Sequence, residues 1–186
     1  MNCSSTNGRI NIIGPNRNQF SLFDKVECDN YDNINKTKLK KASAIVFSPG
    51  PGNPKDYPIT SKIYKKFKGK KKIIGICLGF QQILFCEGGK IVEQKKIYHG
   101  FQSNIEVVND KSLFKKGKKF KVGRYHSLKL KEPFKITDFE ITMRCLESKV
   151  AMSFENNKDK IYGFQFHPES FLTSNGNLLI KKILSA

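Results

Sequence analysis

The fold of this chain is decided by Gly75-Ile76-Cys77-Leu78-Gly79-Phe80-Gln81, where an apolar strand passes into a helix through a cysteine between two glycines. The preceding residues, 72–76, are apolar and rich in β-branched side chains, and the following run, 81–85, ends before a glycine pair at 88–89. Such a turn strains the backbone and projects its central side chain at the carboxyl edge of the sheet. The positive end of the next helix favours a thiolate. The stretch predicts an α/β fold with Cys77 as a nucleophile.

A histidine near the other end of the chain can serve this cysteine as a base. Taken alone, a cysteine is more often a small core residue, so a nucleophile must be supported by a base, an orienting group and oxyanion donors. Residues 161–166 predict an apolar strand that ends at His167, and Pro168 keeps His167 extended. Residues i and i+2 then point the same way, so Glu169 can accept a hydrogen bond from His167. Taken alone, the segment 167–169 is best interpreted as a histidine at the end of a strand with a glutamate nearby by chance. Together with Cys77, the same segment predicts a base, His167, and the group that orients it, Glu169.

A rigid loop, Ser48-Pro49-Gly50-Pro51-Gly52-Asn53-Pro54, follows the strand-like residues 44–47. Its simplest interpretation is a turn. Prolines and glycines nevertheless fix its shape and leave backbone N–H groups open to a ligand at the carboxyl end of a strand, where open α/β sheets bind their substrates. The amides of Gly52 and Leu78 are therefore candidate donors to an oxyanion.

Four motifs in a fixed order together resemble the class I (triad) glutamine amidotransferases over roughly residues 44–186. They are the loop at 48–54, the elbow at 75–81, Arg-Tyr-His-Ser-Leu at 124–128, and Gly-Phe-Gln-Phe-His-Pro-Glu-Ser at 163–170. Within that family the set is similar to the glutaminase subunit, or component II, of anthranilate synthase and of aminodeoxychorismate synthase. Each motif alone is moderately specific, and the ordered set is strongly so.

The resemblance implies a reaction and a set of residues. Cys77 attacks the side-chain amide of L-glutamine, His167 moves the proton, Glu169 holds His167, and a thioester is hydrolysed to glutamate after ammonia leaves. Carried over by position, the glutamine pocket is lined by Gly50, Pro51, Gly52, Leu78, Gln81, Ser127 and Leu128. The ammonia passes to a separate chorismate-binding synthase subunit. His126 is outside the triad, and His99-Gly100 is interpreted as structural.

The chain departs from the family pattern in two places. Phe80 stands where relatives usually carry histidine, which predicts a change in packing rather than in chemistry. At the N-terminus, residues 9–13 run into a short polar stretch at 14–16 instead of a long helix, which puts docking to the usual synthase partner in question. The segment 29–32 looks like a family motif but falls where the second strand belongs, so it is interpreted as coincidence.

The order of apolar segments favours one α/β domain over residues 1–186, with a mixed, largely parallel central sheet flanked by helices. The predicted strands lie near 9–13, 25–29, 44–48, 72–77, 90–94, 102–108, 121–125, 149–154 and 161–167, and the helices near 55–68, 79–87 and 175–185. The absence of a spanning apolar run or a signal peptide predicts a cytoplasmic protein without a membrane partner.

Composition limits the other functions. The five cysteines, Cys3, Cys28, Cys77, Cys86 and Cys145, include no Cys-x-x-Cys pair, so we expect neither a disulfide framework nor a metal, and no cofactor is implied. The chain has 34 Lys+Arg against 16 Asp+Glu, a net charge of +18. Such charge attracts nucleic acid, but lysine predominates and no nucleic-acid module is visible, so a solvated surface is favoured. A glutaminase for another synthase, or a noncatalytic interaction or nucleic-acid-binding protein on the same fold, are the alternatives.

Overall fold

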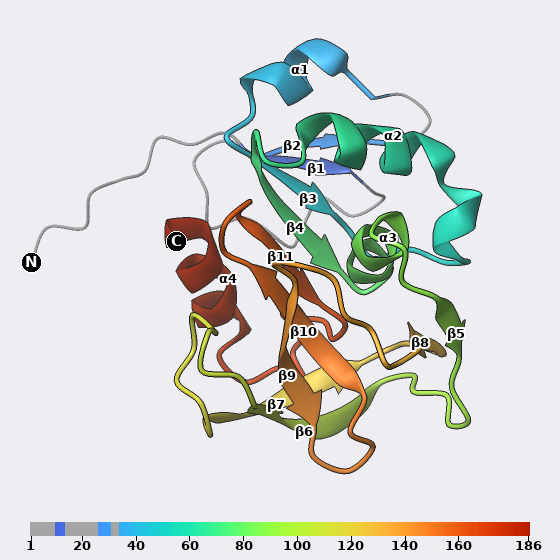
Figure 1. Cartoon of the computed structure of the whole chain (residues 1–186), viewed down its shortest axis with the longest axis vertical. Coiled ribbons are helices and arrows are strands. Elements are labelled where there is room, and N and C mark those ends of the chain that lie inside the picture. Colours follow the sequence, from blue (N-terminus) through green and yellow to red (C-terminus); the bar gives the residue numbers. More distant parts are fainter. Residues whose placement is uncertain (1–9, 14–25, 31–33) are drawn as a thin grey trace, which may run out of the picture.

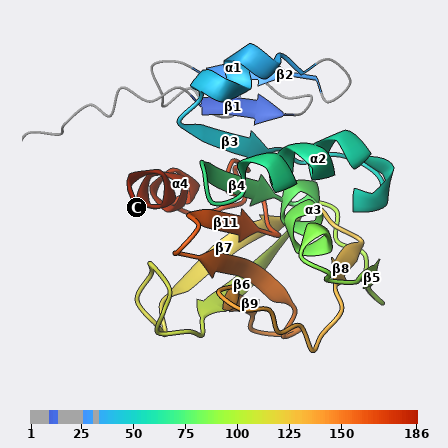
Figure 2. The same cartoon turned by 45° about the horizontal axis from the view of Figure 1, so that its top comes forward.

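The computed structural model describes residues 10–13, 26–30 and 34–186, which form a central nine-stranded sheet with helices on both faces (Figures 1 and 2). The strands follow the order β2-β1-β3-β4-β11-β10-β9-β6-β7. The parallel part contains β1 (Ile10–Ile13), β2 (Val26–Asp29), β3 (Ala44–Phe47), β4 (Lys72–Ile76) and β11 (Ile161–Phe164). The antiparallel part contains β6 (Phe101–Val107), β7 (Lys119–Arg124), β9 (Glu140–Cys145) and β10 (Ala151–Asn156).

Helix α4 (Gly176–Ser185) covers one face of the parallel strands, and α1 (Lys36–Lys41), α2 (Pro58–Phe67) and α3 (Leu78–Cys86) cover the other. A 3-10 turn, η1 (Pro54–Asp56), precedes α2, and a separate ribbon joins β5 (Ile91–Glu93) to β8 (Leu128–Leu130). No helix in the described part of the chain combines the length and apolarity that a bilayer crossing requires.

Alternation along the strands divides the core into two layers. In β3, Ile45 and Phe47 pack with residues of α1, α2 and α3, whereas Ala44 and Val46 pack with residues of α4. Successive side chains of a strand point to opposite faces, so one four-residue apolar run serves both layers. Figure 2 shows α4 on one side of β4 and β11 and α3 on the other. The parallel strands are thus covered on both faces, and their open carboxyl ends remain for a site.

Each predicted strand and helix has a counterpart in the structure, and the sheet is mixed as predicted, its parallel part formed by the five strands from β2 to β11. The sequence reasoning missed α1, β8 and β9. Helix α1 has six residues and buries only Leu39, so it lacks a visible period. Strand β9 shows no clear alternation of buried and exposed residues. The strand predicted at 25–29 is confirmed as β2. Phe80 is fully buried and its ring packs against that of Phe154. The polar stretch at 14–16 lies outside the described residues.

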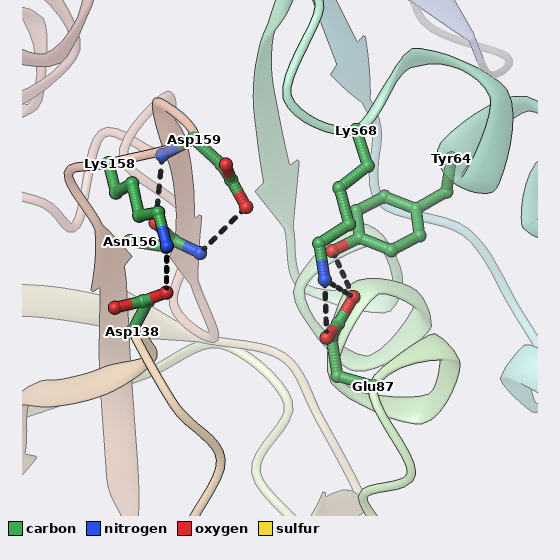
Figure 3. Close-up of polar contacts among 7 residues, drawn as sticks. All are labelled: Tyr64, Lys68, Glu87, Asp138, Asn156, Lys158 and Asp159. Carbon is green, nitrogen blue, oxygen red and sulfur yellow. Dashed lines mark hydrogen bonds and ion pairs between the residues drawn. The ribbon is translucent and has the colours of Figure 1, made fainter.

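A largely buried carboxylate, that of Glu87, connects α2 to the end of α3 (Figure 3). The hydroxyl of Tyr64 donates to Glu87 Oε1 at 2.6 Å, and Lys68 Nζ donates to both oxygens of Glu87 at 2.7 and 2.8 Å. Burial and the Glu87 carboxylate raise the pKa of Tyr64 above its ordinary value, so its hydroxyl stays a donor. Figure 3 also shows the ion pair of Lys158 with Asp138, whose groups are far more exposed.

We expect Tyr64→Phe to lower the free energy of unfolding by about 1–2 kcal/mol, because it removes one hydrogen bond to a charged and largely buried acceptor. Chemical denaturation monitored by circular dichroism measures this change. Lys158→Ala is the matched control, and it should leave the unfolding midpoint where it is, since solvent screens its ion pair. An equal midpoint for Tyr64→Phe and wild type would show that the Tyr64 hydroxyl contributes nothing net.

Candidate active site

Three predicted site segments lie at one edge of the sheet. Strands β3, β4 and β11 are neighbours and run parallel, so their carboxyl ends face the same way. The loop at 48–54 leaves β3, Cys77 follows β4, and His167 comes shortly after β11. Residues separated by up to 119 positions in sequence are thereby collected at the place where open α/β sheets hold their ligands.

Cys77 stands on a tight and strained turn between β4 and α3. Its φ of 52° and ψ of −102° are rare for a residue with a side chain, and its N–H donates to the carbonyl of Phe164 at 2.8 Å. Glycine is required at positions 75 and 79 because neighbouring backbone atoms approach closely there, and not because of a positive φ. A Cβ atom on Gly79 would collide with the carbonyl of Phe47, and one on Gly75 would collide with the carbonyl of Gly79. The backbone therefore has the form of the predicted nucleophile elbow.

His167 and Glu169 are hydrogen-bonded as the sequence predicts. Nδ1 of His167 lies 2.7 Å from Oε1 of Glu169, and the side chains are 14% and 6% exposed. The His167 N–H donates to the carbonyl of Gly123 in β7, and Thr173 donates to the His167 carbonyl at 2.6 Å, so the backbone of the base is fixed from two sides. The ring of Tyr125 packs edge-on against the imidazole, with the centroids 4.9 Å apart.

The charge state of His167 follows from its surroundings. Burial lowers the pKa of His167, but the neighbouring Cys77 and the hydrogen-bonded carboxylate of Glu169 outweigh burial and raise the pKa to about 9. The Nε2 atom is buried and has no hydrogen bond of good geometry to any described residue, so Cys77 acts on it through proximity and charge. At neutral pH the imidazole therefore holds a proton beside the sulfur.

The loop after β3 lies against the start of α3. A Cβ on Gly50 would lie 2.9 Å from Leu78 Cδ2, so the loop and the residue after the nucleophile are in contact. Gly52 has a φ of +80°, which suits glycine, and Tyr57 donates from its hydroxyl to the carbonyl of Pro51 at 2.7 Å. The amide of Leu78 is in the first turn of α3, where no helical acceptor is available. The loop that carries Gly52 therefore lies against the side chain of the residue after Cys77.

The remaining predicted pocket residues are Gln81 in α3 and the pair Ser127 and Leu128 at the start of β8. Gln81 is 3% exposed, and its Nε2 donates to the carbonyl of Leu128 at 3.3 Å. Ser127 precedes β8, and its carbonyl accepts from the N–H of Gln94 at 2.9 Å. The short ribbon of β5 and β8 therefore fixes the backbone of 127–128 beside α3.

Sequence reasoning missed Gln165 and Tyr125. Gln165 is completely buried, and its Nε2 lies 3.9 Å from Cys77 Sγ. A signal was present in the predicted strand at 161–167, because residues 165 and 167 of an extended segment point to the same side. Tyr125 lies within one of the four motifs, but only the pairing of β7 with the His167 segment places its ring on the imidazole. Among the described residues, no cluster of histidine, cysteine and carboxylate side chains is arranged to hold a metal ion.

Comparison with known proteins adds a family and relatives. Residues 18–186 match the family model described as glutamine amidotransferase class-I. The anthranilate synthase component 2 of Lactococcus lactis is 38% identical over 165 residues, which cover 88% of this chain and 83% of that protein. The protein of the same name from Buchnera aphidicola subsp. Schizaphis graminum is 36% identical over 173 residues, which cover 91% of this chain and 85% of that protein.

A solved structure supports the fold independently. The crystal structure of a glutamine amidotransferase from Thermotoga maritima superposes with a TM-score of 0.68 over 88% of this chain and 76% of its own. Its sequence is 18% identical, so this likeness concerns the fold alone.

Proposed function

Because the chain belongs to the class I glutamine amidotransferase family, we propose that it is the glutaminase subunit of anthranilate synthase, with Cys77, His167 and Glu169 as its triad. The observation that carries the proposal is the meeting of Cys77 with the hydrogen-bonded pair His167 and Glu169 in a chain 38% identical to an anthranilate synthase component 2. We further propose that residues 1–186 form one domain devoted to this reaction.

The chemistry assigns one step to each group. The Cys77 sulfur attacks the side-chain carbonyl carbon of L-glutamine, and the amides of Leu78 and Gly52 donate to the oxyanion that forms. The protonated His167 then gives its proton to the leaving nitrogen, and ammonia departs. Water, deprotonated by His167, attacks the thioester and releases glutamate and the sulfur. Glu169 keeps the imidazole oriented and favours its charged form.

The proposed ammonia acceptor is a chorismate-using synthase subunit that binds this chain. The curated relatives named above are called anthranilate synthase component 2, which favours anthranilate over 4-amino-4-deoxychorismate as the product. Aminodeoxychorismate synthase is the alternative partner within the family. Reconstitution with either synthase subunit, followed by identification of the aminated product, distinguishes them.

Labelling by an electrophilic glutamine analogue tests the site without knowledge of the partner. We expect a single adduct on Cys77, located by peptide mass spectrometry and prevented by excess L-glutamine, because the pocket would hold the analogue beside the sulfur. The other described cysteines, Cys28, Cys86 and Cys145, serve as internal controls. Labelling spread evenly over them, or insensitive to glutamine when the synthase partner is present, would contradict the proposal.

A further inference from the structure

A continuous chain of hydrogen bonds leads from the side of the pocket to the nucleophile. The two N–H groups of Gln81 are shared between the carbonyl of Leu128, at 3.3 Å, and Oε1 of Gln165, at 3.1 Å. Gln165 in turn donates from Nε2 to Cys77 Sγ at 3.9 Å, within the range of bonds to sulfur. Gln165 is fully buried and Gln81 nearly so, so solvent does not compete for these bonds.

The end of this series of hydrogen bonds that lies farthest from Cys77 is held by a buried histidine, His126. Burial and the charge of Arg124 lower the pKa of His126 to about 4, so its ring is neutral. Its Nε2 accepts from Arg124 Nε at 3.1 Å, and the proton is therefore on Nδ1, which donates to the carbonyl of Leu128 at 2.9 Å. That carbonyl thus receives two donors, one from His126 and one from Gln81.

Two groups of fixed hydrogen-bonding role, the Arg124 guanidinium and the Leu128 carbonyl, set the direction of these hydrogen bonds. Arg124 is fully buried, its guanidinium carbon lies 3.5 Å from the ring centroid of Tyr98, and none of its partners among the described residues is acidic. A guanidinium can only donate, so His126 Nε2 must accept. The Leu128 carbonyl can only accept, so it orients the Gln81 amide with Nε2 as the donor, and Gln81 Nε2 in turn requires Oε1 of Gln165 as its acceptor. The last donor, the amide of Gln165, consequently faces the sulfur.

We propose that Gln165 is a positioning residue, which couples the glutamine pocket to the nucleophile by accepting from Gln81 and donating to the sulfur of Cys77. The inference rests on the proposed function, in which Cys77 reacts as a thiolate. A donor to the sulfur stabilises its negative charge and fixes its direction, and displacement of Gln81 by a ligand would move that donor.

The test is the rate at which iodoacetamide alkylates Cys77, measured by peptide mass spectrometry between pH 5 and 10. This readout needs neither turnover nor a partner. His167 is the titratable group in contact with Cys77, Glu169 acts through His167, and Arg124 and His126 stand at the far end of the chain. We expect Gln165→Met, a substitution of similar volume, to slow alkylation at neutral pH about tenfold and to move the midpoint of the profile to higher pH.

A second buried glutamine provides the matched control. Gln82 is 1% exposed, bonds to Ser61 at 2.7 Å and lies 3.8 Å from the sulfur of Cys86, so it resembles Gln165 in burial and contacts. Gln82→Met should leave the Cys77 profile unchanged. Gln165→Glu, which keeps an acceptor for Gln81 but loses the donor, should slow alkylation at least as much as Gln165→Met, and serves if the latter does not fold.

The outcomes separate this inference from the proposed function. If wild-type Cys77 reacts no faster than an ordinary thiol, the nucleophile assignment fails and this inference fails with it. If wild-type Cys77 is reactive at neutral pH but both Gln165 variants keep its profile, only the role of Gln165 is overturned. A slower Gln165→Met beside an unchanged Gln82→Met supports the role.

Discussion

Cys77→Ser is expected to reduce glutamine-dependent synthesis by at least about 10⁴-fold in the complex with the synthase partner, while leaving ammonia-dependent synthesis intact. Serine keeps the size of the side chain, so the elbow and its hydrogen bond to Phe164 should persist. What is lost is the sulfur nucleophile beside a protonated imidazole. The measurement is the rate of aminated product formed from chorismate with glutamine or with ammonium as the nitrogen source.

The same substitution at the far end of α3 is the control for this result. Cys86 is half-buried in the last turn of that helix, and Cys86→Ser should keep both activities. Loss of both activities in Cys77→Ser would mean that Cys77 supports the fold or the interface instead of the chemistry. Retention of glutamine-dependent synthesis would rule out the thioester route.

Local patterns in the sequence predicted the proposed triad, because each of its parts can be recognised from a few neighbouring residues. Cys77 is recognisable from the apolar run before it and the glycines around it, and Glu169 from its spacing to His167. That these parts meet follows from a general property of parallel strands, whose carboxyl ends share an edge. The resemblance to a family supplied the proposed pocket residues, and the structure shows two contacts among them, of Gly50 with Leu78 and of Gln81 with Leu128.

The bonds between segments could not be predicted, since they depend on register. Gln165 contacts Cys77 because Phe164 pairs with Ile76, and no sequence pattern specifies that alignment. His126 was set aside as a residue outside the triad, although it braces the Leu128 carbonyl. Helix α1 and strand β9 were missed for another reason, the absence of a periodic signal in the sequence. Helix α1 is short and buries one residue, and the residues of β9 do not alternate between buried and exposed.

His167→Gln is expected to lower glutamine-dependent activity nearly as much as Cys77→Ser, and Glu169→Gln to cost about 100-fold less. The imidazole transfers the proton in both half-reactions, whereas Glu169 acts only by orienting the ring and favouring its charged form. Ammonia-dependent synthesis should be unchanged in both variants, which controls for assembly. Equal losses in the two variants would contradict the division into base and orienter.

The pH profile gives the orienter a signature that a merely structural role would not produce. His167 must be protonated to release ammonia, and its pKa is raised to about 9, so wild-type kcat/KM with glutamine should fall on the alkaline side near that pH. Glu169 is one of the two groups that raise this pKa against burial. Its replacement by Gln therefore moves the alkaline limb to lower pH, and the variant loses more activity at pH 8.5 than at pH 7. An alkaline limb that stays in place would show that Glu169 does not set the charge of His167.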